Sequence, residues 1–124
     1  MAAPNILSLT TITGKTSTLL LTDTSANTLL SNAASSGKVF KINTITVANV
    51  DGSAAADITI TYNSAAAGGG TAYALASTIS VAADSTLVVL DKATSIYLEE
   101  DRSLVATAGA ANDLVVTISY EDIS

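Results

Sequence analysis

Short runs of alternating apolar and polar residues constrain the fold of this chain more than any other feature. From Leu114 to Glu121 and from Ile58 to Asn63, every second residue is Leu, Val, Ile or Tyr, and the residues between them are mostly Thr, Ser or Asn. This two-residue period places apolar side chains on one face of an extended strand and polar side chains on the other. Val, Ile and Thr also suit a pleated surface. Both segments therefore predict half-buried strands.

Turn signals separate ten such segments along the chain. The candidate strands are residues 5–12, 16–22, 26–32, 38–50, 56–63, 72–82, 86–91, 95–99, 103–108 and 113–121. Many short strands in 124 residues predict an all-β fold, an antiparallel β-sandwich that is jelly-roll-like. We expect residues 13–124 to form this single domain. Residues 1–12 form either an N-terminal extended arm, favoured by Pro4, or the first strand.

Three segments leave alternatives open. Ser25 could cap a short helix that runs to Ala34 in place of the strand at 26–32. Residues 39–50 change the phase of their alternation, which indicates either a bulge near Asn43 or burial of both faces. The bulge, which we favour, would let one long strand serve both sheets. The Asp51-Gly52 pair predicts a hairpin between this strand and the next.

Two segments have little to pack against. Ser64 to Thr71 contains three alanines and three glycines in succession, so we expect a mobile loop. Met1 to Asn5 is expected to be an extended arm that either frays or pairs with the exposed sheet edge of a neighbouring molecule.

The chain has no His and no Cys, the residues that supply most proton shuttles, thiolate nucleophiles and transition-metal ligands. Ser35 and Lys38 have the spacing of a Ser–Lys pair, but Gly37 favours a turn over the helix that such a pair needs. We predict that the protein is not an enzyme. No catalytic, cofactor-binding or metal-binding residue is assigned, and no cofactor is expected.

The acidic run Glu99-Glu100-Asp101 is interpreted as a solvated strand end and turn. Adjacent strand residues point to opposite faces, so Glu99 and Glu100 do not form the facing pair of a glycosidase. A calcium site would need further oxygens from Asp51, Asp91 or Asp113.

Two glycine-containing stretches have weak phosphate-loop features. Gly14-Lys15-Thr16 lacks the leading glycine of a P-loop and is interpreted as a turn. Gly68 to Gly70 is interpreted as a flexible loop. Tyr62 and Tyr120 share the parity of the apolar faces of their strands, so we expect them to cap the core.

The charge of the chain limits its partners. Eleven acidic residues against five basic ones give a net charge of −6, and the basic residues are dispersed, so we expect no nucleic-acid binding. No apolar run is long enough to span a membrane, and Met1 to Thr13 lacks the pattern of a secretory signal. We therefore expect folding in a reducing cytosol and no membrane association.

Residues 38–123 resemble small structural proteins of tailed bacteriophages, including cyanophages. The resemblance lies in the order of the segments KINTITVANVDG, ITITY, YALA, IYLEEDRSLVATA and LVVTISYEDI. It implies a virion structural protein assembled in the host cytoplasm, a homo-oligomer that acts as a capsid decoration or cement protein on the major capsid protein. The alternatives are a tail, baseplate or fibre-associated protein and a host-glycan-binding module.

Overall fold

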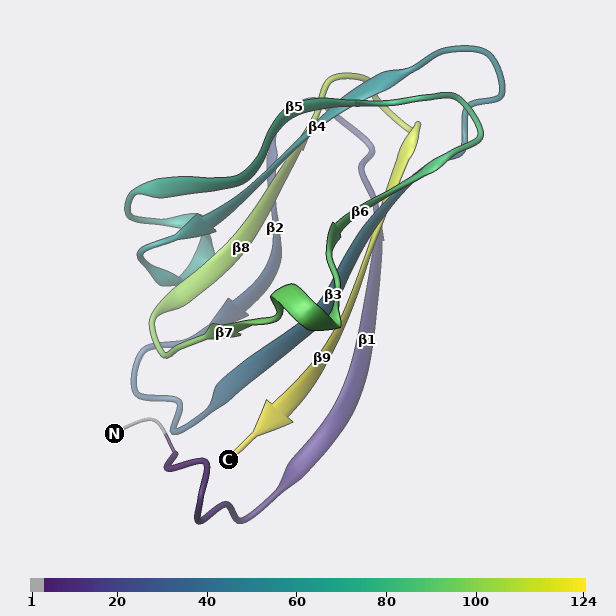
Figure 1. The fold of residues 1–124 in the computed structure, drawn as a ribbon. Helices are drawn as coiled ribbons and strands as arrows, with labels where there is room; N and C mark the ends of the chain where they lie inside the picture. The colour runs from purple at the N-terminus through teal and green to yellow at the C-terminus, as the bar shows by residue number, and fades with distance from the viewer. Residues whose placement is uncertain (1–3) are drawn as a thin grey trace.

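The computed structural model describes residues 4–124, which form two antiparallel sheets packed face to face (Figure 1). The first sheet, here called sheet A, has the order β1 (Ile12–Leu20), β9 (Leu114–Ile123), β3 (Val39–Asn49) and β6 (Thr86–Leu90), and β7 (Ile96–Leu98) also pairs with β3. Sheet B has the order β2 (Ala26–Asn32), β8 (Arg102–Ala108), β4 (Ala56–Asn63) and β5 (Ala72–Val81). Two 3-10 helices, η1 (Ala66–Gly68) and η2 (Lys92–Thr94), lie in the connections. The predicted all-β sandwich is confirmed, while its jelly-roll-like topology stays a prediction.

The core lies between the sheets and consists mainly of branched aliphatic side chains. Its fully buried members come chiefly from the central strands and include Ile42, Ile45, Ile58, Ile60, Leu104 and Ile118. Alternate residues of β4 and β9 point inward, as the two-residue period predicted. Because few aromatic residues are available, the core is held by many contacts between aliphatic side chains in place of a few contacts between large rings.

The predicted bulge in β3 is confirmed. Ile42 pairs with Tyr120 and Thr44 with Ser119, so Asn43 has no partner on β9. The extra residue shifts the phase and keeps Ile45 on the core side together with Ile42. The expectation that this strand serves both sheets is wrong, because β3 stays in sheet A along its whole length.

The N-terminal strand boundaries differ from the prediction. The candidate strands 5–12 and 16–22 are replaced by the single strand β1, and Gly14 is an extended residue within it and not a turn. At an exposed sheet edge a glycine interrupts no packing, so the strand continues through it. Residues 5–8 form a turn in which the Leu7 amide donates to Asn5 Oδ1 (2.9 Å). The other eight candidate strands appear within two residues of their predicted ends.

The predicted strand at 26–32 is confirmed, because these residues form β2, paired with β8, and the alternative helix capped by Ser25 is not formed. One further expectation is wrong. The Asp51-Gly52 segment is not a hairpin, because it leads from β3 in sheet A to β4 in sheet B. There the Asp51 carboxylate accepts hydrogen bonds from the backbone and hydroxyl of Ser53 (2.9 Å each), a local turn that redirects the chain between the layers.

Candidate functional site

β1 is an edge strand with an open outer side. Within residues 4–124 it pairs with β9 alone, without a register shift, from Ile12 opposite Ile123 to Leu20 opposite Val115. Eight of its nine residues are exposed, on both faces of the strand. They include Ile12 (56% exposed), Leu19 (36%) and Leu20 (41%). β1 therefore overhangs the sandwich and presents a free row of backbone hydrogen-bonding groups.

The other sheet edges carry features that hinder the addition of a strand. β2 has a register break between Thr28 and Leu30 and packs against η1. β5 has two register shifts against β4 and a positive φ at Thr78. β6 and β7 are only five and three residues long. Bulges and short strands are the usual protection of sheet edges, so β1 is the edge most accessible to a partner.

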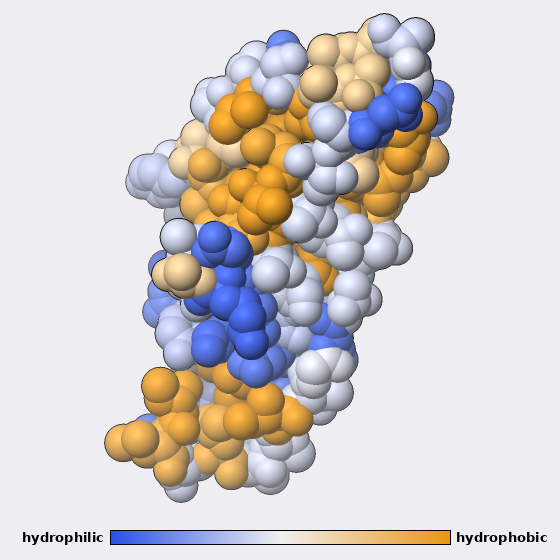
Figure 2. Space-filling model, turned by 45° about the vertical axis from the view of Figure 1, so that its right-hand side comes forward, coloured by the Kyte–Doolittle hydropathy of each residue, from blue (hydrophilic) through white to orange (hydrophobic). Residues whose placement is uncertain are grey.

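The segment before β1 lies against the outer face of sheet A, near the C-terminus (Figure 1). Val39 and Ile123 pair across β3 and β9 and are only 5% and 4% exposed, yet neither belongs to the core between the sheets. Val39 shares a pocket with Pro4 and Ile6, so the N-terminal segment covers it from outside. Leu7, in the same segment, is 93% exposed. Figure 2 shows the apolar area at this lower end of the molecule.

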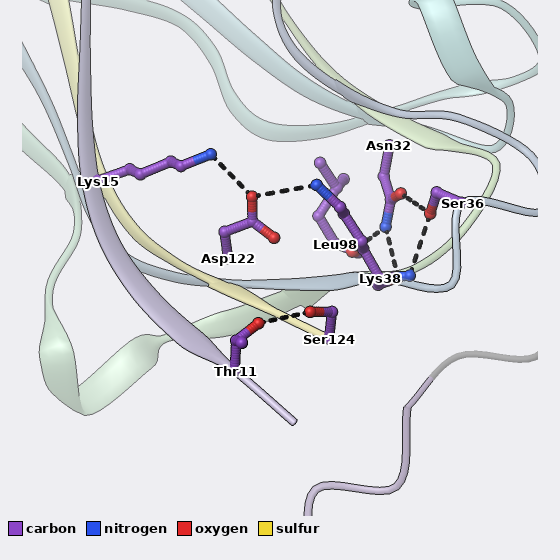
Figure 3. Close-up of polar contacts among 8 residues, drawn as sticks. All are labelled: Thr11, Lys15, Asn32, Ser36, Lys38, Leu98, Asp122 and Ser124. Atoms are coloured by element: carbon purple, nitrogen blue, oxygen red, sulfur yellow. Dashed lines mark hydrogen bonds and ion pairs between the residues drawn. The ribbon is translucent and has the colours of Figure 1, made fainter. Parts of the chain in front are cut away.

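Polar contacts fasten β1 to its neighbours at the same end (Figure 3). Asp122 accepts hydrogen bonds from the ammonium groups of Lys15 (2.8 Å) and Lys38 (3.5 Å), and Thr11 Oγ1 lies 2.6 Å from Ser124 Oγ. Burial alone would raise the pKa of Asp122, but the hydrogen bond and charge of Lys15, together with Lys38, outweigh it and lower the pKa. The same contact raises the pKa of Lys15.

Three buried asparagines secure the ends of strands, a role that the sequence analysis missed. Each is the last residue of its strand and is at most 5% exposed. Their amide groups donate to backbone carbonyls as follows: Asn32 to Lys38 and Leu98, Asn49 to Ala54 and Val81, and Asn63 to Gly68. An asparagine at the end of a strand pattern, followed by a loop of small residues, was the available signal.

The loop at 64–71 is not the loosely packed segment that was predicted. The amides of Ala67 and Gly68 donate to the hydroxyls of Ser31 and Ser103 (2.9 Å each), and Ser103 in turn donates to the Ala65 carbonyl (2.7 Å). Because the loop lacks bulky side chains, its backbone approaches the hydroxyls of β2 and β8 directly. The Gly68 amide is used in this way and does not form a phosphate cradle.

Ser35 and Lys38 do not form a catalytic pair. Ser35 is exposed in the predicted turn with a φ of 59°, whereas the Lys38 ammonium contacts Asp122. The hydroxyl of Ser36, not that of Ser35, is held in place, since it donates to the Asn32 side chain.

The acidic residues 99–101 separate into different contacts. Glu100 accepts from the backbone amide of Gly37 (3.4 Å) and Asp101 from that of Ala66 (3.0 Å), while Glu99 is exposed. In residues 4–124 no three acidic side chains are grouped closely enough to hold a metal ion, so Asp51, Asp91 and Asp113 do not complete a calcium site with them.

The tyrosines divide into two classes. Tyr62 and Tyr120 pack against the core, as predicted, and the ring centroid of Tyr120 lies 5.5 Å from that of Phe40. Burial raises the pKa of Tyr62, whose hydroxyl donates to the Tyr97 carbonyl (3.3 Å). Tyr73 and Tyr97 are 61% and 44% exposed, but they lie in different sheets.

Comparisons with known proteins indicate the fold and not the activity. No family model matches the sequence, and no curated protein is significantly similar to it. A structure from work on Bacillus endospore appendages, described as a family of disulfide-linked pili, superposes with a TM-score of 0.53 at 16% identity and covers 92% of this chain and 88% of that one. A second structure, from the T13 particle of the virus IBDV, gives a TM-score of 0.47 at 10% identity and covers 94% of this chain but 32% of that one. At 16% identity the likeness to the pilus structure concerns the fold alone.

No helix in the described part of the chain is long and apolar enough to cross a membrane.

Proposed function

We propose that this protein is a non-enzymatic structural subunit that assembles by adding a strand of a second copy to the open edge of β1. The observation that carries the proposal is the uninterrupted and exposed edge of this nine-residue strand, whose single charged residue, Lys15, is paired with Asp122. A partner strand would satisfy the free backbone groups and cover Ile12, Leu19 and Leu20. The covered apolar area adds to the hydrogen bonds, so both favour the same contact.

The N-terminal residues 1–12 are proposed to act as an arm appended to a single domain of residues 13–124. In the described structure Pro4 and Ile6 lie on the outer face of their own sheet A beside Val39, and the amides of Thr10 and Thr11 donate to the Ser124 carbonyl. The same segment of a neighbouring molecule would make the same contacts, since only residues 7–9, before the backbone bonds of Thr10 and Thr11 to Ser124, have to change direction. Exposed Leu7 would then be buried against the partner.

In its finer form the proposal is a virion protein that decorates or cements a capsid. Each copy would bind the major capsid protein and bridge neighbouring subunits, so that many modest contacts add through avidity. The proposal is supported by the β-sandwich fold, by the open edge of β1 and by the absence of His and Cys. It is also consistent with the structural neighbour described as a pilus, which is an assembly of subunits. A tail, baseplate or fibre position is the alternative arrangement of the same kind of subunit.

The edge contact is tested with two variants that add equal charge. Thr16→Lys/Thr18→Lys places two ammonium groups on β1, whereas Ala33→Lys/Ala34→Lys places them on the exposed connection between β2 and β3. Light scattering across a concentration series should show self-association of the native protein and of the Ala33/Ala34 variant, and a loss in the Thr16/Thr18 variant. Equal association of both variants would refute the edge contact. Mass spectrometry of purified particles, with copy number per particle, tests the virion location.

A further inference from the structure

Beyond self-assembly, the outer face of sheet A contains a pocket that has both apolar and acidic walls. The pocket has a volume of about 330 Å³ and is lined by Pro4, Ile6, Val39, Tyr97 and Glu99. Its floor is the nearly buried Val39, and its two polar groups come from one strand and the residue after it. Figure 2 shows a hydrophilic band above the apolar lower end of the molecule.

The backbone of β7 fixes the geometry of these polar groups. Leu98 is fully buried in the core, so the residues on either side of it, Tyr97 and Glu99, point to the outer face together. Leu98 pairs with Phe40, which places Val39 beside Glu99 in the same register. A carboxylate, an aromatic face and an aliphatic floor therefore border one open space.

We propose that this pocket receives an arginine side chain of a partner protein. The aliphatic stem would contact Val39 and Ile6, while the planar guanidinium would stack on Tyr97 and donate to the Glu99 carboxylate. No Lys or Arg nitrogen in residues 4–124 lies within ion-pair distance of Glu99. The nearest lysine in the register, Lys41, stands opposite Tyr97 and also opposite Glu121 on β9.

The partner is a different protein and not a second copy of this chain. The chain has one arginine, Arg102, whose guanidinium donates to the carbonyls of Ser64 (3.1 Å) and Asp101 (2.8 Å) and is therefore already engaged. The net charge of −6 also favours approach of a basic surface. The pocket and the β1 edge are separate surfaces, and an arm exchanged between copies would supply the same Pro4 and Ile6 to the pocket, so this contact does not depend on pairing at β1.

The test is an NMR titration of the full chain at low salt with the peptide acetyl-Gly-Arg-Gly-amide. The neutral control peptide carries citrulline, which has nearly the shape of arginine but no charge. We expect saturable shifts of the Val39 methyl and Tyr97 ring signals, with a dissociation constant on the order of millimolar for one side chain. The citrulline peptide should bind at least about fivefold more weakly.

Matched variants assign the contact. Glu99→Gln should weaken binding of the arginine peptide by about fivefold. The double variant Tyr97→Leu/Glu99→Gln should bind the peptide more weakly still. Glu121→Gln removes an equal charge from the same sheet face outside the pocket and should leave the affinity unchanged. Equal binding of the citrulline peptide, full affinity in Glu99→Gln, or no shifts at Val39 and Tyr97 would each overturn the proposal. None of these outcomes bears on the β1 contact, which is read by light scattering.

Discussion

Replacing Asn49 with alanine should destabilise the sandwich more than its small volume suggests. The Asn49 side chain is 3% exposed and makes three hydrogen bonds with the backbone. Its amide donates to the carbonyls of Ala54 (3.0 Å) and Val81 (2.9 Å), and its Oδ1 accepts from the amide of Asp51 (2.9 Å). These contacts hold the passage from sheet A to sheet B and reach the end of β5.

The expected loss follows from the groups left without a partner. A typical hydrogen bond contributes about 1 kcal/mol net, and a buried group left unpaired costs about 1–3 kcal/mol. Water can reach part of this connection, so we expect the free energy of unfolding to fall by about 3 kcal/mol for Asn49→Ala. At roughly 4 °C per kcal/mol for a domain of this size, the melting temperature should fall by about 12 °C.

Calorimetry and urea denaturation measure this loss, and two further variants make the result specific. Asn43→Ala removes the same side chain from the bulge of the same strand, where it makes no hydrogen bond with the described residues, and should cost less than about 1 kcal/mol. Asn49→Asp has the same shape but faces two carbonyl oxygens with a carboxylate, so at neutral pH it should be worse than Asn49→Ala. A loss below about 1 kcal/mol in Asn49→Ala, or a well-tolerated Asn49→Asp, would refute the reasoning.

Three other perturbations test the structure. Asp122→Asn should lower the free energy of unfolding at neutral pH. The pKa of Asp122 is lowered in the folded state, so its carboxylate contributes fully to stability above about pH 4. This contribution disappears as the pH falls through the folded pKa. Urea titrations should therefore converge in acid for variant and native protein, and parallel curves at every pH would contradict the ion pairs. Gly70 has a φ of +70°, and in Gly70→Ala the new methyl group would lie 2.8 Å from a backbone nitrogen. Thermal melts should therefore show a loss of stability of about 2 kcal/mol or more. Gly52→Ala, whose nearest new contact is 3.5 Å, should be nearly neutral. Ile45→Ala leaves a cavity at a fully buried position, so urea denaturation should show the free energy of unfolding falling by about 3–4 kcal/mol. Val88 is 57% exposed, so Val88→Ala should change it little. Similar losses in both variants would contradict the assignment of Ile45 to the core.

The alternation of apolar and polar residues was sufficient to predict a strand wherever one face of that strand is buried in the core. The alternation around Ile58 and Ile118 predicted both the strands and their inward faces, because a half-buried strand has the same two-residue period as its side chains. The phase change near Asn43 predicted the bulge for the same reason. The inward placement of Tyr62 and Tyr120 followed from parity alone.

The sequence by itself determined the class of fold, the approximate strands and the residue types that the chain lacks, since these depend on residue type and spacing along the chain. Only the tertiary structure decided which strands lie at an edge, that the connection between β3 and β4 leads from one sheet to the other, and which polar groups meet. Asn49 and Val81, or Lys15 and Asp122, are distant in sequence and come together through sheet order, which no local period encodes. The open side of β1 is likewise set by the sheet order, because β9 is its one strand partner among the described residues, and both faces are exposed because β1 overhangs the sandwich.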